Sequence, residues 1–204
     1  MKPTFIYLTL FPQVFHNYFQ VSLAKKARKK RLIDYQAYNI RDFASKGKVD
    51  DYPYGGGVGM LLKIGPLVQS LATVQEFYFP NYVVLLSPQG KRFQQKDILP
   101  LLNQAPNLVF ICGHYEGFDE RILAYVDEQI SIGDFVTMGG EMPALVITEA
   151  LIRAVPGVIQ AESYQQETFT NYQLDFANYT RPRFFRNLAV PSVLLSGHHQ
   201  KIAE

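Results

Sequence analysis

The chain of 204 residues contains little cysteine and histidine. Its single cysteine, Cys112, excludes a disulfide within the chain and is typical of a reducing compartment, so we expect a cytoplasmic protein. The four histidines are scattered, and the adjacent pair His198-His199 lacks the i, i+4 spacing of a helical metal site. The residues therefore predict no metal site of their own.

Long apolar runs are also missing. No run reaches the roughly 18 residues that a membrane-spanning helix needs, so we predict no membrane partner. The start, MKPTFIYLTLF, has one lysine before apolar residues but no small-residue cleavage site, and it is better interpreted as a first strand over Phe5–Leu10. The net charge of +2 is small, so only its distribution along the chain is informative.

A glycine-rich segment lacks the residues of the known nucleotide-binding loops. Four glycines stand within positions 55–59, but no Gly-Lys-Ser/Thr follows, and Leu62 occupies the third glycine position of the dinucleotide fingerprint. The segment is either a flexible hairpin or linker, or an ordered loop whose backbone passes close to a ligand or another chain. The flanking residues Tyr52-Pro53-Tyr54 and Met60-Leu61-Leu62 favour the ordered loop.

Three short apolar runs each stop at a polar, glycine-containing segment. Tyr82–Leu86 precedes SPQG, Leu108–Cys112 precedes GHYEGFDER, and Ile130–Ile132 precedes GDFVTMGG. An open parallel sheet presents its ligand loops in this way, at the carboxyl ends of its strands. With helical segments between the runs, the pattern predicts an α/β fold in which the three loops converge on one pocket.

The segment Met142–Val155 is expected to form a helix, with Pro143 in its first turn and Pro156-Gly157 after its end. Almost all of its positions are apolar, which is typical of a helix buried on more than one side. It also carries Glu149 and Arg153, four residues apart on one face. These two form either an ion pair at the edge of the core or a site with a catalytic arginine, and both interpretations stay open at this point.

Positive charge is concentrated in two segments. Six basic residues fall within positions 25–31, and they form either a solvated helix face or a contact to a phosphate backbone. The second segment, Thr180–Arg186, places arginines beside Phe184 and Phe185. Arginine beside aromatic residues suits nucleic-acid contact through charge and stacking, and an ordinary surface loop is the alternative.

Seven motifs occur together and in register along the chain. They are PYGGGVGM, LSPQG, CGHYEGFDER, SIGDFVTMGGEMPALV, PGVI, LDFANYTRP and VPSVLLSGHH. The set closely resembles the bacterial tRNA (guanine-N1) methyltransferase family, which modifies guanosine 37 next to the anticodon. The resemblance runs from near residue 1 to about Ile202.

The resemblance implies a SPOUT-type fold, an α/β domain with a deep trefoil knot. It also implies S-adenosylmethionine as the cofactor, tRNA as the substrate, and a homodimer whose active sites are built from both subunits. Magnesium would be a further ion used by the family. On this basis we divide the chain into a cofactor-binding domain at 1–160, a flexible linker at 161–175, and a shortened start of a C-terminal tRNA-binding domain at 176–204.

The same resemblance assigns roles to individual residues. Asp175 matches the proposed general base and Arg153 the catalytic arginine. The cofactor site would be formed by Leu86, Ser87, Pro88, Gly113, Tyr115, Glu116, Ser131, Ile132, Gly133, Asp134, Phe135, Val136, Thr137, Gly139, Gly140 and Pro143. The chain departs from the family pattern at His114, where arginine is usual, at Ala177, which replaces a common proline, and at Glu167-Thr168-Phe169.

The chemistry of guanine methylation fits these assignments. N1 carries a proton, and a carboxylate such as Asp175 can remove it, which contributes roughly 10²–10⁴-fold to the rate. The negative charge that then develops on O6 can be stabilised by Arg153 where water is excluded. A tRNA-binding or cofactor-binding protein without turnover, and a nucleotide-binding regulator that uses positions 55–59, are the alternatives.

Overall fold

The structure is a computed structural model that describes residues 2–160, 164, 169, 177–198 and 200. The chain divides into two compact units, Met1–Gln166 and Glu167–Glu204, and each is considered by itself. The division into segments 1–160, 161–175 and 176–204 stays a prediction.

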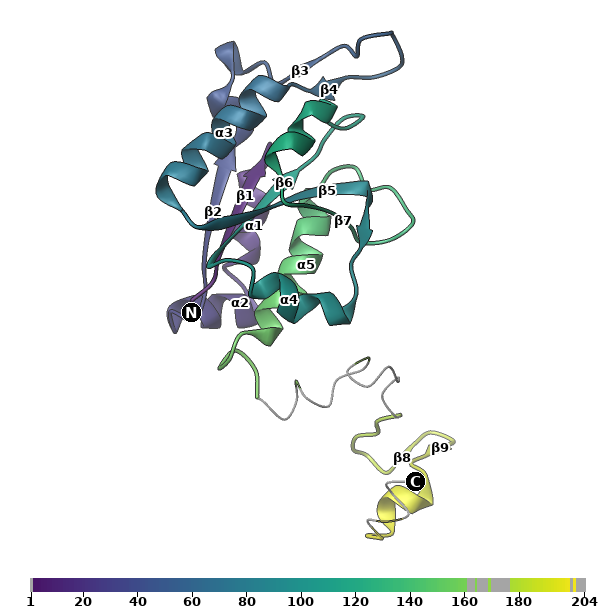
Figure 1. Cartoon of the computed structure of the whole chain (residues 1–204). Helices are drawn as coiled ribbons and strands as arrows, with labels where there is room; N and C mark the ends of the chain where they lie inside the picture. Colours follow the sequence, from purple (N-terminus) through teal and green to yellow (C-terminus); the bar gives the residue numbers. More distant parts are fainter. Residues whose placement is uncertain (1, 161–163, 165–168, 170–176, 199, 201–204) are drawn as a thin grey trace. The chain divides into compact units, whose positions relative to one another are not determined.

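The first unit is built on a five-stranded sheet (Figure 1). Its strands are β1 (Thr4–Thr9), β2 (Asp34–Asn39), β5 (Asn81–Arg92), β6 (Asn107–Cys112) and β7 (Glu128–Ser131). The order is β2-β1-β6-β5-β7, and every neighbouring pair is parallel. The predicted α/β fold with a parallel sheet is thereby confirmed, while the trefoil knot stays a prediction.

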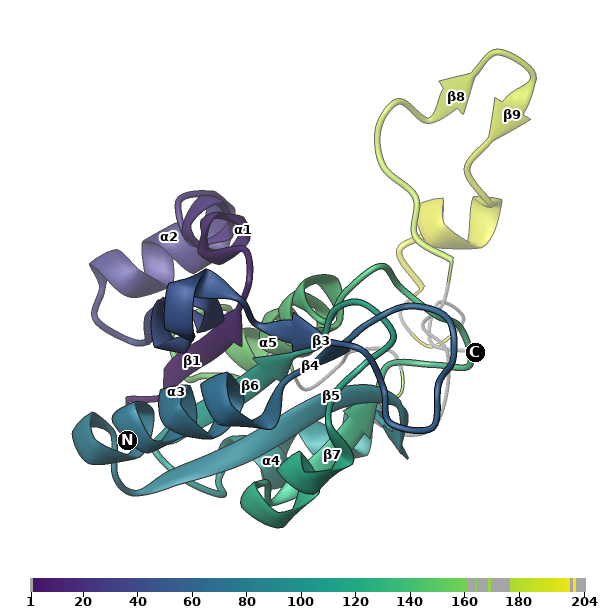
Figure 2. The same ribbon diagram turned by 90° about the horizontal axis from the view of Figure 1, so that it is seen from above.

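Helices cover both faces of this sheet. One face packs against α1 (Pro12–Tyr18), α2 (Ser22–Lys29), α4 (Ile98–Leu102) and α5 (Glu141–Ala154). The other packs against α3 (Ile64–Phe77) and the short 3-10 helices η1 (Ile40–Phe43) and η4 (Glu120–Tyr125). Figure 2 shows α1 and α2 on the opposite side of β1 from α3. Two further 3-10 turns, η2 (Ser45–Gly47) and η3 (Gln95–Asp97), connect elements.

Alternating side chains of the strands form the two cores. In β1, Phe5 and Tyr7 point into the core under α1 and α5, whereas Ile6 and Leu8 point into the core under α3. The apolar runs that predicted the strands are continuous rather than alternating because both faces are buried.

Several element boundaries differ from the expected ones, most clearly in β2 and β5. The alternating residues Leu32–Ala37 predict the second strand, but the strand begins at Asp34 and ends at Asn39. The run Tyr82–Leu86 was expected to end in a loop, but β5 continues to Arg92, with a register shift against β7 between Leu86 and Lys91. Such an irregularity lets a strand contain Pro88, which cannot donate a ladder hydrogen bond.

The glycine-rich segment is the tip of a hairpin between β3 (Asp50–Asp51) and β4 (Leu61–Leu62). Backbone hydrogen bonds tie the hairpin to the loop after β6: the Glu116 amide donates to Met60 at 3.0 Å, and the Leu62 amide donates to Gly117 at 2.9 Å. These bonds favour the ordered loop over a linker.

The second unit has few regular elements in its described part. An antiparallel pair, β8 (Phe184–Phe185) and β9 (Leu188–Ala189), is followed by the 3-10 helix η5 (Ser192–Leu195). The Arg183 guanidinium lies 5.8 Å from the ring centre of Phe184, and that of Arg186 lies 5.4 Å from the ring centre of Phe185. Throughout the described residues, no helix is both long enough and apolar enough to cross a membrane.

Candidate functional site

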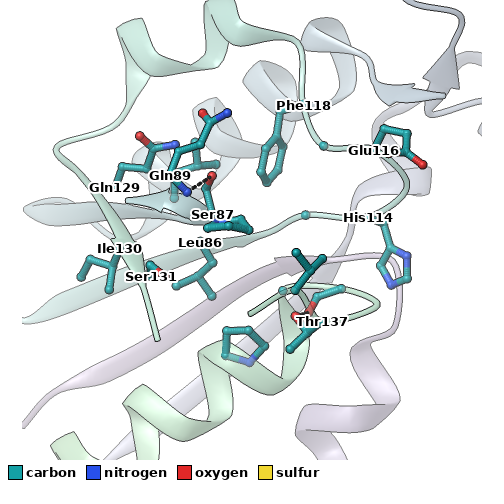
Figure 3. A pocket seen from close by; sticks show the side chains of 18 of the residues that line it. Leu86, Ser87, Gln89, His114, Glu116, Phe118, Gln129, Ile130, Ser131 and Thr137 are labelled. Atoms are coloured by element: carbon teal, nitrogen blue, oxygen red, sulfur yellow. Dashed lines mark hydrogen bonds between the residues drawn. The ribbon is translucent and has the colours of Figure 1, made fainter. Parts of the chain in front are cut away.

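A pocket of about 380 Å³ opens at the carboxyl ends of β5, β6 and β7. Its volume lies within the roughly 300–1,000 Å³ that is usual for small-molecule sites. It is lined by residues 85–89 of β5, by the loop after β6 together with η4, and by β7 with the loop from β7 to α5. Figure 3 shows Leu86 and Ser87 on the β5 wall, between Phe118 and Thr137 of the two loops. The three loops therefore converge as the sequence predicted.

Most of the residues expected in the cofactor site lie around this one pocket. All of them line it except Gly133 and Asp134. Asp134 is exposed and forms an ion pair with Arg92 at 3.6 Å. Gly133 lies below the surface, and a side chain there would collide with the ring of Phe135. The structure thus places these two beside the pocket rather than on its wall.

Two glycines, Gly113 and Gly140, lie side by side in the pocket wall. The Gly140 amide donates to the Gly113 carbonyl at 2.8 Å. A Cβ on Gly140 would stand 2.7 Å from the Cα of Cys112, which is closer than real Cβ contacts come. Glycine is needed at this position because the start of α5 presses directly on the end of β6.

Short hydrogen-bonded turns shape the loop from β7 to α5. The Ser131 hydroxyl accepts from the Gly133 amide at 3.2 Å, and the Thr137 hydroxyl donates to the Gly139 carbonyl at 2.8 Å. Between these turns Phe135 and Val136 are exposed, at 57% and 83%. The polar turns fix the loop while its apolar side chains stay available for contact.

The pocket also contains residues that the sequence did not single out. Gln89 and Gln129 lie on its wall together with Phe118. Gln89 follows Pro88 in the LSPQG motif, and Gln129 directly precedes the apolar run at Ile130. Their position next to the apolar runs was a usable signal, but the register shift in β5 between Leu86 and Lys91 has no sequence signature.

A buried carboxylate stands behind the pocket. Glu141 is 5% exposed and accepts a 2.7 Å hydrogen bond from the Thr9 hydroxyl. Its other oxygen lies 3.4 Å from Nε2 of His114, which lines the pocket.

Burial raises the pKa of the neighbouring Cys112 thiol, and the Glu141 charge raises it further. That thiol is therefore protonated and unsuited to act as a nucleophile.

Arg153, one of the two residues assigned to catalysis, lies outside the pocket wall. Arg153 is half-buried on α5, ten residues after Pro143, which places it about 15 Å further along the helix. The Glu149 carboxylate accepts a hydrogen bond from Tyr18, at the end of α1. Asp175, expected to be the base, lies outside the described residues.

The helix that carries Arg153 is confirmed, but it is buried less completely than expected. It begins at Glu141 and ends at Ala154. Met142 and Val146 are 52% and 53% exposed and lie four residues apart on one face. The helix packs against α1, α4 and β6, as burial on more than one side implies, while the face with Met142 and Val146 stays exposed.

Within the described part of the chain, no three or more His, Cys, Asp or Glu side chains gather at a spacing that could hold a metal ion. A role for magnesium stays a prediction.

Comparisons with known proteins cover the whole length of the chain. The family model described as tRNA (Guanine-1)-methyltransferase TrmD matches residues 2–204. A tRNA (guanine-N(1)-)-methyltransferase of Mycoplasma capricolum is 44% identical over 200 residues, which cover 97% of this chain and 82% of the relative. A protein of the same name from Staphylococcus haemolyticus is 46% identical, with the same coverage. The crystal structure of tRNA (m1G37) methyltransferase from Aquifex aeolicus superimposes with a TM-score of 0.86 at 39% identity, covering all of this chain and 87% of that one.

Proposed function

Because the chain belongs to the tRNA (guanine-1)-methyltransferase family, we propose that it transfers a methyl group from S-adenosylmethionine to N1 of guanosine 37 in tRNA. The observation that carries the proposal is the pocket at the ends of β5, β6 and β7, around which nearly all of the expected cofactor residues gather.

The residues present fit S-adenosylmethionine. The pocket has the volume of a small-molecule site, and glycines at 113, 139 and 140 form part of its wall. Gln89, Gln129 and the backbone of the loops supply the few polar groups that fix a ligand's orientation. When bound, the cofactor supplies an electrophilic methyl group on its sulfonium, so the protein contributes mainly alignment.

We assign removal of the guanine N1 proton to Asp175, and stabilisation of the negative charge that develops on O6 to Arg153. A carboxylate between the apolar residues Leu174 and Phe176 is a suitable base because partial desolvation raises its pKa. Arg153 lies about 15 Å along α5 from the pocket wall, so we assign it to the pocket of a second subunit. Each active site then requires both subunits of a homodimer.

An exposed apolar face supports this homodimer. Met142 and Val146 of α5 and Phe11, just before α1, are each about half exposed in the first unit. Large apolar side chains grouped at one end of a helix are typical of a surface that a partner covers. A second copy of the chain is the partner we assign to this face, because it would place Arg153 of one subunit at the pocket of the other.

Basic side chains on each unit support contact with tRNA. Five exposed cations lie on or just after α2, and none of them has an ion pair among the described residues: Lys25, Lys26, Lys29, Lys30 and Arg31. In the second unit, arginines lie over Phe184 and Phe185, which remain largely exposed. Charge of this kind binds phosphates without sequence preference, so the pocket would provide the specificity.

The test is mass spectrometry of a tRNA bearing guanosine 37 after incubation with the chain and S-adenosylmethionine, with and without a magnesium chelator. N1-methylguanosine at position 37 is the expected product. If the cofactor binds and the tRNA stays unmodified, the chain is a cofactor-binding protein without turnover. Methylation at another nucleotide or atom would contradict the assigned position.

A further inference from the structure

We propose that Glu141 is a positioning residue for the methyl-transfer reaction, acting through His114 on the two glycine-containing loops that form the pocket. The proposal rests on the proposed function for its kinetic consequences, but the arrangement itself can be tested without turnover.

Glu141 joins three parts of the fold that meet behind the pocket. It is the first residue of α5, its Oε1 accepts from Thr9 at the end of β1, and its Oε2 lies 3.4 Å from His114 after β6. Thr9 is itself oriented, because its hydroxyl accepts from the Phe11 amide at 2.9 Å and must direct its own hydrogen to Glu141. The carboxylate is therefore held in one position by a side chain whose hydrogen-bonding roles are already fixed.

The Glu141–His114 pair encloses the backbone of Gly139. A Cβ built on Gly139 would stand 2.5 Å from both Oε2 of Glu141 and Nε2 of His114. The next residue, Gly140, donates its amide to Gly113, which directly precedes His114. Both loops thus touch the pair, and displacement of either side chain changes the width of the pocket between residues 113 and 140.

A carboxylate in this position needs compensation for its burial. Glu141 is 5% exposed, and a buried charge is costly unless it is paired and hydrogen-bonded. Thr9 and His114 provide the partners, and the N-terminus of α5 adds a favourable dipole. Because Glu141 is buried directly behind a pocket, where an apolar side chain would pack without this cost, we infer a functional role for it rather than simple core packing.

His114 connects the carboxylate to the pocket surface. Its ring is part of the pocket wall and packs against Phe11, with ring centres 5.0 Å apart. The Glu141 side chain does not itself line the pocket. Glu141 therefore acts on a bound ligand only through His114 and the glycine backbone, which makes it a positioning residue and not a catalytic one.

The first experiment is a double-mutant cycle with Glu141→Gln, His114→Ala and the combined variant. Misplacement of a reacting group by about 1 Å costs up to about a hundredfold, so we expect kcat/KM for S-adenosylmethionine to fall roughly ten- to hundredfold in Glu141→Gln, with tRNA affinity unchanged. The combined variant should be no worse than His114→Ala alone, because both changes remove one interaction. Losses that multiply in the combined variant would overturn the proposal.

The matched control is Glu76→Gln, which makes the same chemical change at an exposed position of α3. It should leave kcat/KM for S-adenosylmethionine and the affinity for tRNA at their wild-type values. His114→Arg tests rescue, because a guanidinium is a longer donor that can also reach the carboxylate. That variant should keep most of the activity in the presence of Glu141 and lose it with Glu141→Gln; equal activity in both backgrounds would contradict the proposal.

The second experiment needs no cofactor or tRNA. Hydrogen exchange at the Gly140 amide reports the bond between the two loops, and we expect it to accelerate about tenfold or more in Glu141→Gln. Exchange at Phe110, in the middle of β6, should stay unchanged. Unaltered Gly140 exchange would exclude a positioning role even if the wild-type chain methylates no tRNA. Faster exchange without methylation would instead contradict only the proposed function.

Discussion

Gly140 lies against Cys112 without space for a side chain, since a Cβ on Gly140 would stand 2.7 Å from the Cα of Cys112. The contact brings the start of α5 onto the end of β6, beside the pocket that both Gly140 and Gly113 line. Because the neighbouring atoms belong to the backbone, they cannot move aside as a flexible side chain would.

Substitution of Gly140 by valine is expected to weaken cofactor binding. Overpacking of this kind costs about 1–3 kcal/mol, which corresponds to roughly five- to 150-fold in the dissociation constant measured by calorimetry. Gly65→Ala is the control, because its Cβ would meet no atom within 4 Å and alanine favours the helix. An unchanged dissociation constant for Gly140→Val would remove Gly140 from the site.

Replacement of Asp175 by alanine should separate binding from chemistry. The cofactor dissociation constant should remain nearly unchanged, while single-turnover methylation should fall by roughly 10²–10⁴-fold because no group removes the N1 proton. Asp175→Asn, which keeps the size and loses the basicity, should fall equally. If either variant retained most of its rate, another group would have to be the base.

Reversal of charge on α2 should weaken tRNA binding without changing cofactor binding. In Lys25→Glu/Lys29→Glu, we expect the slope of log K against log salt to become shallower by about 0.7–0.9 for each phosphate that the protein no longer neutralises. Lys46→Glu/Lys96→Glu makes the same change in net charge at exposed positions outside α2. An equal decrease of tRNA affinity in the two double variants would indicate a general charge effect rather than a specific binding surface.

The buried hydrogen bond between Tyr7 and Thr148 should matter for stability and not for the reaction. The two hydroxyls are 2.8 Å apart and both side chains are fully buried. Thr148→Val leaves the Tyr7 hydroxyl without a partner and should lower the free energy of unfolding, measured in urea, by about 1–3 kcal/mol. Adding Tyr7→Phe removes the orphaned group, so the double variant should recover part of the stability; a further decrease of similar size would contradict this role for the hydrogen bond.

Much of the fold could be predicted from the sequence because burial on both faces leaves a simple pattern. The runs at Phe5, Tyr82, Leu108 and Ile130 are apolar, the last three are followed by glycine-containing segments, and the structure places a strand at each of the four. The helix from Glu141 to Ala154 follows from its first-turn proline and the Pro156-Gly157 stop. The motifs of the three loops were sufficient to indicate one pocket.

The sequence by itself determined the elements, the family motifs and the residue types of the site, because these depend on local periodicity and on identity at each position. Tertiary structure alone decided that Thr9, His114 and Glu141, distant in the chain, form one buried group. The tertiary structure also placed Gly133 and Asp134 beside the pocket rather than on its wall, and it left one apolar face of α5 exposed. Contacts between residues far apart in sequence depend on how strands order and helices pack, and no local pattern encodes that order.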